Sequence, residues 1–367
     1  MMDNFVNITD VCSEIFAGGD APKPNMSVTK TDEYKIPIFS NGEADNGLYG
    51  YTNFARVTKP SITVSARGTI GFVAVRNEPF VPIVRLISLT PDPEKIEIRY
   101  LYYAIQNYKF DGSGTSIPQL TVPMLKKYSF PLPTKEQQLA IIDQLDNVCN
   151  LISLRRQQLS KLDELVKSRF IELFEKEEYK KVTVSSVLNT GFWLMPATPE
   201  FIVDGEVPYI TSKNIKNRTI DFDNVKYISR EAYKSISANR PTQKGDILIS
   251  MIGTLGQTAV IQNDREFYGQ NLYLLRLNNA VVNTTYFCEF FNSNTAQYEL
   301  QGKRNQSTQA YLKANHVEDL ILPLPPMELQ EQFADFVKQV DKSKLAIQKS
   351  LEKLETLKKA LMQKYFG

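Results

Sequence analysis

The stretch that decides the fold is PLPTKEQQLAIIDQL at residues 131–145, because PLPPMELQEQFADFV follows at residues 323–337. The two stretches lie 192 positions apart and align without a gap, which pairs Glu136 with Glu328 and Gln138 with Gln330. Helices commonly begin just after prolines, and neither stretch has an internal Pro or Gly further along. We therefore predict that a long helix begins at each stretch.

Shorter matches extend the repeat toward the N-terminus of each half. They pair residues 6–11 with 182–187, 37–40 with 208–211, and 65–71 with 250–256. The separation drifts from 176 through 171 and 185 to 192, as loop insertions would produce. The sequence thus predicts two similar globular halves, each followed by a helix, and it permits a pseudo-two-fold axis. DNA has such an axis in its backbone, but many duplicated proteins never contact DNA.

Each helical segment carries an apolar seam with alternating steps of four and three residues, which is the spacing of a coiled coil. The first seam comprises Ile141, Leu145, Val148, Ile152, Arg155, Leu159, Leu162, Val166, Arg169 and Leu173, and the second comprises Phe333, Val337, Val340, Lys344, Ile347, Leu351, Leu354, Lys358, Leu361 and Tyr365. We expect the two helices to pack on each other. A dimerising coiled coil, or helices packed on their own globular halves, are the alternatives.

Polar residues flank both seams and predict a solvated face or, alternatively, a docking surface for a partner. They are Gln137, Gln138, Gln157, Gln158 and Lys161 in the first segment, and Gln330, Gln332, Lys342 and Lys349 in the second.

The globular halves have the patterns of mixed α and β structure. Residues 61–65 and 246–250 are rich in β-branched residues, and each run precedes a Gly-Thr-x-Gly turn and a second apolar run, which predicts a hairpin. Residues 100–108 and 285–298 have helical patterns. We predict an α+β fold with a first globular domain at 1–133, a spacer helix at 134–178, a second globular domain at 179–325 and a C-terminal spacer helix at 326–367.

Composition limits the class of protein. The 367 residues are 42% hydrophobic, which is typical of a globular protein with two domains. The net charge is only +2, so any DNA-binding groups must be clustered or supplemented by a partner. Cys12, Cys149 and Cys288 have neither zinc nor redox spacing, which favours a reducing cytoplasm. We expect no signal peptide and no membrane-spanning segment.

Catalytic motifs are not apparent in the sequence. His316 is the single histidine, and no GxxxxGK[ST] loop or Asp/Asn-Pro-Pro-Tyr/Phe tetrapeptide occurs. Residues 91–95 contain two carboxylates and a lysine, as a nuclease motif does, but the carboxylates are too close together in the sequence. A proline-rich turn explains this segment better. We therefore predict no catalytic residues, no metal site and no cofactor bound by this chain.

Polar loops and glycine-rich turns supply candidate DNA contacts. Glycine permits close approach to a phosphate, Arg and Lys suit guanine, and Asn and Gln suit adenine. Exposed loops without a partner, or turns that merely need positive φ, are the alternative interpretation. The candidates are Lys23, Arg56, Lys59, Ser65, Arg67, Thr69, Ser113, Thr115, Gln119, Lys213, Asn214, Thr254, Gln270, Asn271, Lys303, Arg304, Gln306 and Gln309.

The full chain resembles the DNA specificity subunits of type I restriction–modification systems. The resemblance rests on the tandem order, the Pro-Leu-Pro segments leading into Glu-x-Gln helices, the Gly-Thr-x-Gly turns, and residues 306–312. It implies two target recognition domains that each read half of a bipartite site, and antiparallel helices that set the unread gap. It also implies two methylation subunits, restriction (motor-nuclease) subunits, and S-adenosylmethionine, ATP and Mg in those partners only.

The resemblance does not extend to individual base-reading residues, since target recognition domains vary greatly. One departure is that the first half lacks a counterpart of Lys303 and Arg304, so Lys23, Arg56, Lys59 and Arg67 are its candidate phosphate contacts. The leading hypothesis is a non-catalytic adaptor that reads double-stranded DNA. The alternatives are a two-domain coiled-coil scaffold that binds only proteins, and an enzyme whose active site has no familiar motif.

Overall fold

A computed structural model describes residues 5–108, 119–194, 198–216, 218–237, 242–252, 255–302 and 311–367. The chain divides into two compact units. Unit 1 comprises residues 1–156 and 348–367, and unit 2 comprises residues 157–347. Among the residues described, no helix is both long enough and apolar enough to cross a bilayer.

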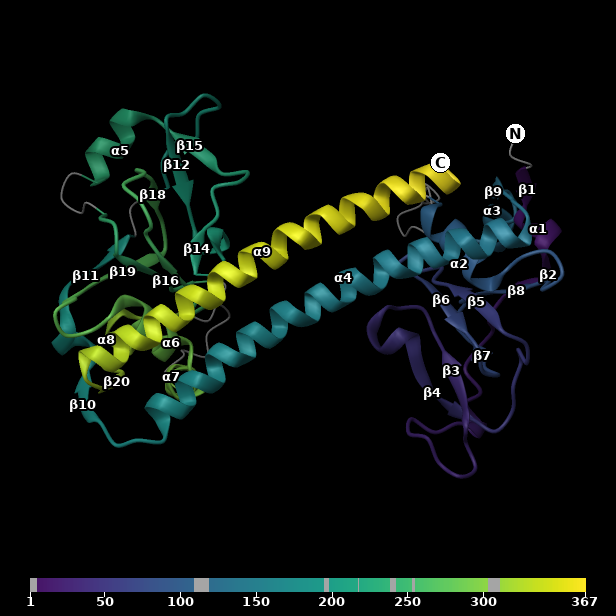
Figure 1. Cartoon of the computed structure of the whole chain (residues 1–367), viewed down its shortest axis with the longest axis horizontal. Coiled ribbons are helices and arrows are strands. Elements are labelled where there is room, and N and C mark those ends of the chain that lie inside the picture. Colours follow the sequence, from purple (N-terminus) through teal and green to yellow (C-terminus); the bar gives the residue numbers. More distant parts are fainter. Residues whose placement is uncertain are drawn as a thin grey trace. The chain divides into compact units, whose positions relative to one another are not determined.

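The described residues of unit 1 form three small sheets (Figure 1). Its four-stranded sheet has the order β2-β8-β5-β6, its three-stranded sheet has the order β4-β3-β7, and β1 pairs with β9. The elements are β1 (Phe5–Asn7), α1 (Ile8–Val11), β2 (Cys12–Ala17), η1 (Lys23–Asn25), β3 (Ile36–Phe39), η2 (Ala44–Gly47), β4 (Leu48–Thr52), β5 (Ser61–Val64), β6 (Val73–Arg76), β7 (Val81–Pro82), β8 (Ile87–Pro91), α2 (Ile98–Asn107), α3 (Val122–Leu125) and β9 (Ser129–Pro131).

Unit 2 repeats the topology of these three sheets and has in addition the two-stranded sheet β13-β14. Its four-stranded sheet has the order β11-β19-β16-β17, its three-stranded sheet has the order β15-β12-β18, and β10 pairs with β20. The elements are β10 (Lys180–Thr183), η4 (Val184–Val187), β11 (Leu188–Leu194), β12 (Val207–Ile210), η5 (Ser212–Asn214), β13 (Ile215–Lys216), β14 (Thr219–Ile220), β15 (Lys226–Ile228), α5 (Arg230–Ser237), β16 (Ile247–Ser250), β17 (Thr258–Val260), β18 (Tyr268–Gly269), β19 (Leu272–Leu277), α6 (Thr284–Asn292), α7 (Asn294–Gly302), α8 (Ala314–Glu318) and β20 (Ile321–Leu324).

The strand registers confirm the predicted internal repeat. β5 pairs antiparallel with β6, and β16 pairs antiparallel with β17, so both predicted hairpins are present. Ile38 pairs with Val81 in a parallel ladder, and Tyr209 pairs with Tyr268 in the same way. The predicted helix at 285–298 is instead two helices, because the backbone of Ser293 is extended between α6 and α7.

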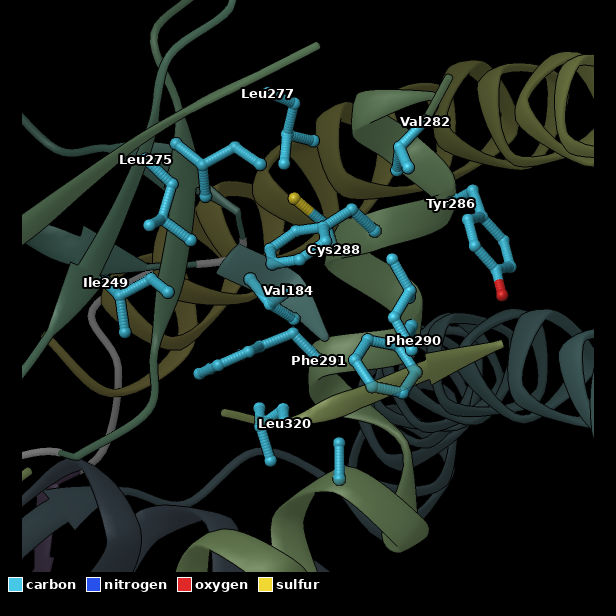
Figure 2. Close-up of a cluster of buried hydrophobic side chains, with 14 of the residues drawn as sticks. Val184, Ile249, Leu275, Leu277, Val282, Tyr286, Cys288, Phe290, Phe291 and Leu320 are labelled. Carbon is cyan, nitrogen blue, oxygen red and sulfur yellow. The ribbon is translucent and has the colours of Figure 1, made fainter. Parts of the chain in front are cut away.

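The core of unit 2 shows how helix and sheet meet (Figure 2). Phe287, Phe290 and Phe291 of α6 belong to one buried cluster with Ile249 and Leu275 of the sheet. In unit 1, α2 covers β5 and β6 in the same way (Figure 1). Burial of each of these large side chains contributes about 1.5–3 kcal/mol to stability.

Two long helices, α4 (Lys135–Phe170) and α9 (Met327–Phe366), begin where the repeated prolines predict. A π-helical turn, η3 (Ile171–Glu175), follows α4. In unit 1, Gln144 accepts a hydrogen bond from Tyr365, and Arg156 pairs with Glu355 at 2.7 Å, so the helices run antiparallel. In unit 2, Lys344 of the predicted seam pairs with Asp163.

The predicted seams are only partly correct at their C-terminal ends, where Leu173, Leu361 and Tyr365 are partly buried but are not the most buried residues. Arg169 is exposed and pairs with Glu172, whereas Phe170 and Phe174 are buried. In α9, Met362 and Phe366 are likewise more buried than Leu361 and Tyr365. The reason is that each helix end packs against a globular core through residues four positions apart, which are Val166, Phe170 and Phe174 in one case and Met362 and Phe366 in the other. The alternative that the helices pack on their own halves does not describe these ends, because the end of α4 packs into the core of unit 2 and the end of α9 packs into the core of unit 1.

The interpretation of Gln138 and Gln330 as outer-face residues is also wrong. Gln138 is 1% exposed, accepts a hydrogen bond from the Glu97 amide at 2.8 Å and donates to the Pro133 carbonyl at 3.0 Å. Gln330 is fully buried, accepts from the Asn283 amide at 2.9 Å and donates to the Pro325 carbonyl at 2.9 Å. These side chains fasten the start of each long helix to the loop before α2 or α6.

Candidate nucleic-acid interface

The turn between β5 and β6 begins the candidate site in unit 1. Ser65 donates its amide to the Phe72 carbonyl at 2.9 Å, and Gly71 donates its amide to the Ser65 carbonyl at 3.0 Å. Gly68 and Gly71 both have left-handed backbones, with φ of 68° and 84°. Glycine is suited to these positions because a Cβ would be strained there. The glycines therefore shape a turn, as the alternative interpretation proposed.

Three segments meet at this turn. Leu120 donates its amide to the Ala66 carbonyl at 2.9 Å, which fixes the segment that precedes α3. Asn41 accepts from the Ala66 amide at 2.7 Å and donates to the Val84 carbonyl at 2.6 Å, which fixes the segment after β7. We call residues 65–72, 83–86 and 119–120, together with Asn41, the first loop junction.

Two predicted contact residues come together on this junction. The Nε and Nη2 atoms of Arg67 donate to Oε1 of Gln119 at 3.2 and 2.8 Å. The Arg67 side chain is exposed, and the remaining N–H groups of its guanidinium are oriented by this contact. Thr69 lies exposed at the tip of the same turn. The arrangement offers charged and polar donors on a shaped surface, as recognition of phosphates or base edges requires.

Unit 2 contains the same junction in a more compact form. Gly256 donates its amide to the Ser250 carbonyl at 2.9 Å and has a φ of 75°. Leu312 donates its amide to the Met251 carbonyl at 2.9 Å, and Met251 donates its amide to the Asn271 carbonyl at 3.3 Å. We call the described part of this region, residues 250–252, 255–257, 270–271 and 311–312, the second loop junction.

Three other candidates have internal roles. Ser65 is buried and accepts from the Gly42 amide at 3.2 Å. Asn214 accepts from the Thr211 amide at 3.0 Å and donates to the Asp221 carbonyl at 3.1 Å, so it holds a turn. Gln270 donates to the Thr198 hydroxyl at 2.9 Å and accepts from Tyr209. These contacts use side-chain groups that would otherwise be available to a base.

The remaining described candidates are basic residues on other loops. Lys23, Lys59 and Lys213 are exposed. Arg56 pairs with Glu14 at 3.4 Å and lies over the Phe16 ring, 4.7 Å from its centroid. Seven candidates lie outside the described residues: Ser113, Thr115, Thr254, Lys303, Arg304, Gln306 and Gln309.

Sequence reasoning missed Asn41 and Arg85 at the first loop junction. Asn41 connects the Ala66 amide to the Val84 carbonyl, and no local sequence pattern predicts such a contact. Arg85 is exposed and has a left-handed φ of 64°, a conformation that sequence patterns do not assign to arginine. Alignment of the two copies around β8 and β19 would have placed Arg85 opposite Asn271.

The buried charges of unit 2 serve the fold. Asp246 is almost fully buried, and its two carboxylate oxygens accept from Arg276 at 2.7 and 2.8 Å. These hydrogen bonds raise the pKa of Arg276 above its usual value. At the equivalent positions of unit 1, the hydroxyls of Ser61 and Thr90 lie 2.8 Å apart. Copies of one fold thus use a charged pair and a neutral pair at the same place.

Comparison with known proteins gives the family to which both halves of the chain are similar. The family described as the type I restriction modification DNA specificity domain matches residues 4–164 and 176–359. A putative type I specificity subunit of Mycoplasma pneumoniae is 37% identical over 139 residues, which are 38% of this chain and 38% of that protein. A second from the same organism is 34% identical over 43% of this chain and 50% of that protein. The matched segments thus span about half or less of these two relatives.

Solved structures show the same fold over nearly the whole chain. The S subunit of a type I restriction–modification system from M. genitalium has a TM-score of 0.58 and 18% identity, covering 99% of this chain and 96% of that one. A chain from a study of complex assembly in the type I system has the same TM-score and 16% identity, with 99% and 97% coverage. Because the family matches twice, in the order of the two repeats, the chain belongs to the family of type I restriction–modification DNA specificity proteins.

Proposed function

We propose that this chain is a non-catalytic subunit that reads a bipartite, gapped site in double-stranded DNA. Unit 1 reads one half-site and unit 2 reads the other. The observation that carries the proposal is the loop junction, which occurs once in each unit and in which three backbone hydrogen bonds recur at equivalent positions. A repeated surface of polar loops on a repeated scaffold is what two half-sites require.

The long helices are proposed as the spacer between the half-sites. α4 has 36 residues and runs from unit 1 into unit 2, and α9 has 40 residues and returns. At about 1.5 Å per residue, α4 is roughly 54 Å long. Packed as an antiparallel coiled coil, the pair would fix how many base pairs lie unread between the half-sites.

Catalysis is assigned to partner subunits. Two methylation subunits would supply S-adenosylmethionine, and restriction subunits would supply ATP- and Mg-dependent cleavage, all in the cytoplasm. Within the described residues, no group of three or more His, Cys, Asp or Glu side chains could hold a metal ion. The net charge of +2 fits a chain that shares phosphate contacts with its partners.

Adenine methylation mapping of host DNA, with the gene intact and deleted, tests this proposal. We expect a split motif with a fixed gap that is lost on deletion and restored by the wild-type gene. If methylation is unchanged, binding of duplex DNA at graded salt decides between the hypotheses. A steep fall with salt indicates phosphate contacts. Absence of DNA binding at every salt concentration would favour a protein-only scaffold.

A further inference from the structure

The backbone turns left-handed at equivalent places in the two loop junctions. Val64 pairs with Ile87 in unit 1, and the equivalent Ile249 pairs with Tyr273 in unit 2. Two residues before Ile87 lies Arg85, with a φ of 64°, and two residues before Tyr273 lies Asn271, with a φ of 58°. Both copies therefore have a left-handed residue at this position, which we call the kink. The side chain at the kink differs, since it is Arg85 in unit 1 and Asn271 in unit 2.

The first copy holds this kink although it has one residue more. Ile83 donates its amide to the Phe39 carbonyl at 2.9 Å, and Gln270 donates to the equivalent Ile210 carbonyl at 3.0 Å. Leu86 and Leu272 are the next equivalent residues. Two residues, Val84 and Arg85, lie between Ile83 and Leu86, but only Asn271 lies between Gln270 and Leu272. The extra residue is Val84, which is 45% exposed and has a φ of 50°.

A left-handed conformation is unfavourable for arginine and more so for the β-branched Val84. Several hydrogen bonds hold it in place, including one of 2.7 Å from the Val84 amide to the Gly19 carbonyl. Arg85 donates its amide to the Gly18 carbonyl at 2.9 Å, and Asn41 joins the Val84 carbonyl to the Ala66 amide. In unit 2, Met251 donates directly to Asn271, so no bridging side chain is needed. Both copies thus anchor the kink to the glycine-rich turn, by different contacts.

The side chains at the two kinks have the chemistry of base readers. Arg85 is exposed, and in the part of the chain that the structure describes it forms no ion pair. Arginine binds O6 and N7 of guanine with two hydrogen bonds, and asparagine binds N6 and N7 of adenine in the same way. Backbone strain kept at a surface position is typical of sites where geometry serves function.

We propose that Arg85 and Asn271 occupy one specificity-determining position, repeated once in each half of the protein. Arg85 specifies a guanine in the half-site read by unit 1, and Asn271 specifies an adenine in the half-site read by unit 2. The inference rests on the proposed function, because it presupposes a DNA site with two halves. It adds which residue of each junction reads a base, and which base it reads.

Glycine substitutions provide the test, since glycine adopts the left-handed backbone and removes only the side chain. A strain lacking the gene receives the wild-type gene, Arg85→Gly, Asn271→Gly or Arg85→Asn, and its adenine methylation is mapped. Asn46→Gly and Asn224→Gly are matched controls, because both residues are left-handed and lie outside the loop junctions. Thermal melting of each purified chain shows whether it is folded.

We expect Arg85→Gly to make one guanine position of one half-site degenerate and to leave the other half-site unchanged. Asn271→Gly should do the same for one adenine of the other half-site. Arg85→Asn should disfavour guanine at that position, and the lost discrimination should be about 10- to 100-fold per position. Both controls should retain the wild-type motif.

The two hypotheses fail in different ways. If the wild-type gene restores no gapped motif, the proposed function fails and this inference fails with it. If the wild type restores a motif and all variants retain it, only the assignment of Arg85 and Asn271 is overturned. The assignment is also overturned if Arg85→Gly and Arg85→Asn melt like the wild type but abolish methylation, because a general contact would then explain Arg85.

Discussion

Gln138 and Gln330 occupy equivalent positions and form equivalent hydrogen bonds in the two halves of the chain. Gln138 and Gln330 each join a proline carbonyl at the start of a long helix to a backbone amide before α2 or α6. Tyr100 and Tyr286 add hydrogen bonds of 2.7 Å to the Pro131 and Pro323 carbonyls. The repeated sequence motif therefore records a requirement of the fold, because buried carbonyls need donors.

Gln330→Ala should destabilise unit 2 by about 1–3 kcal/mol, because it leaves the Asn283 amide and the Pro325 carbonyl without their partner. Urea unfolding followed by the fluorescence of Trp193, the single tryptophan, measures this in the correct unit. The control is Gln332→Ala, on the exposed side of the same helix. Equal stability of the two variants would contradict the role of Gln330.

Cys288 predicts a pH dependence of stability. Burial raises the pKa of its thiol from 9.0 to about 12, so the folded chain keeps a proton that the unfolded chain loses above pH 9. Stability from this group is complete below pH 9 and is lost as the pH rises toward 12. Between pH 8 and 10 the loss is about 1 kcal/mol.

The Trp193 unfolding assay at pH 8 and pH 10 measures this loss, with Cys288→Ala as the comparison. The variant lowers stability at both pH values because it leaves a cavity. Its decrease between the two pH values should be smaller than that of the wild type by about 1 kcal/mol. The same decrease in both proteins would show that Cys288 does not titrate as its burial implies.

At the scale of an element, α4 and the π-helical turn η3 that follows it show two kinds of packing. Leu145, Val148 and Ile152 keep the coiled-coil spacing, but Val166, Phe170 and Phe174 are each four residues apart. Phe170 lies against Phe333 of α9 and Tyr286 of α6, with ring centroids 5.7 and 5.8 Å apart. The helix end therefore belongs to the core of unit 2.

Phe170→Ala should destabilise unit 2 by about 3–5 kcal/mol, as expected for a buried aromatic residue. Arg169→Ala, one position earlier, should change stability by less than about 0.5 kcal/mol, because its ion pair with Glu172 is exposed. Urea unfolding of both variants measures which residue, Phe170 or Arg169, contributes more to stability. The structure predicts Phe170, and the heptad spacing predicts Arg169. A larger loss of stability for Arg169→Ala than for Phe170→Ala would contradict the observed packing and support the heptad prediction.

At the scale of the whole molecule, the spacer hypothesis makes a numerical prediction. Residues 150–156 of α4 and 353–359 of α9 face each other, since Arg156 pairs with Glu355. Deleting both heptads preserves the phase of the seam and shortens each helix by about 10 Å, or roughly three base pairs of DNA. Methylation mapping should then show a changed gap between unaltered half-sites. Methylation with the original gap would eliminate the helices as the spacer.

Sequence reasoning reached much of the fold, and less of the candidate site. The hairpins of β5 with β6 and β16 with β17 were predictable because β-branched runs and Gly-Thr-x-Gly turns are local signals. Arg67 and Gln119 were named separately, but only the fold brings them within 2.8 Å. Arg85 escaped prediction because its left-handed backbone depends on contacts with Gly18 and Asn41.

The sequence by itself determined the tandem repeat, the starts of the long helices and the family, because these follow from local chemistry and from the comparison of one half with the other. Tertiary structure alone decided which polar residues are buried. Gln138 and Gln330 have the composition of a solvated helix face, yet they are buried because the loops before α2 and α6 present amides that need acceptors. Such needs arise between segments distant in sequence, where periodicity carries no information.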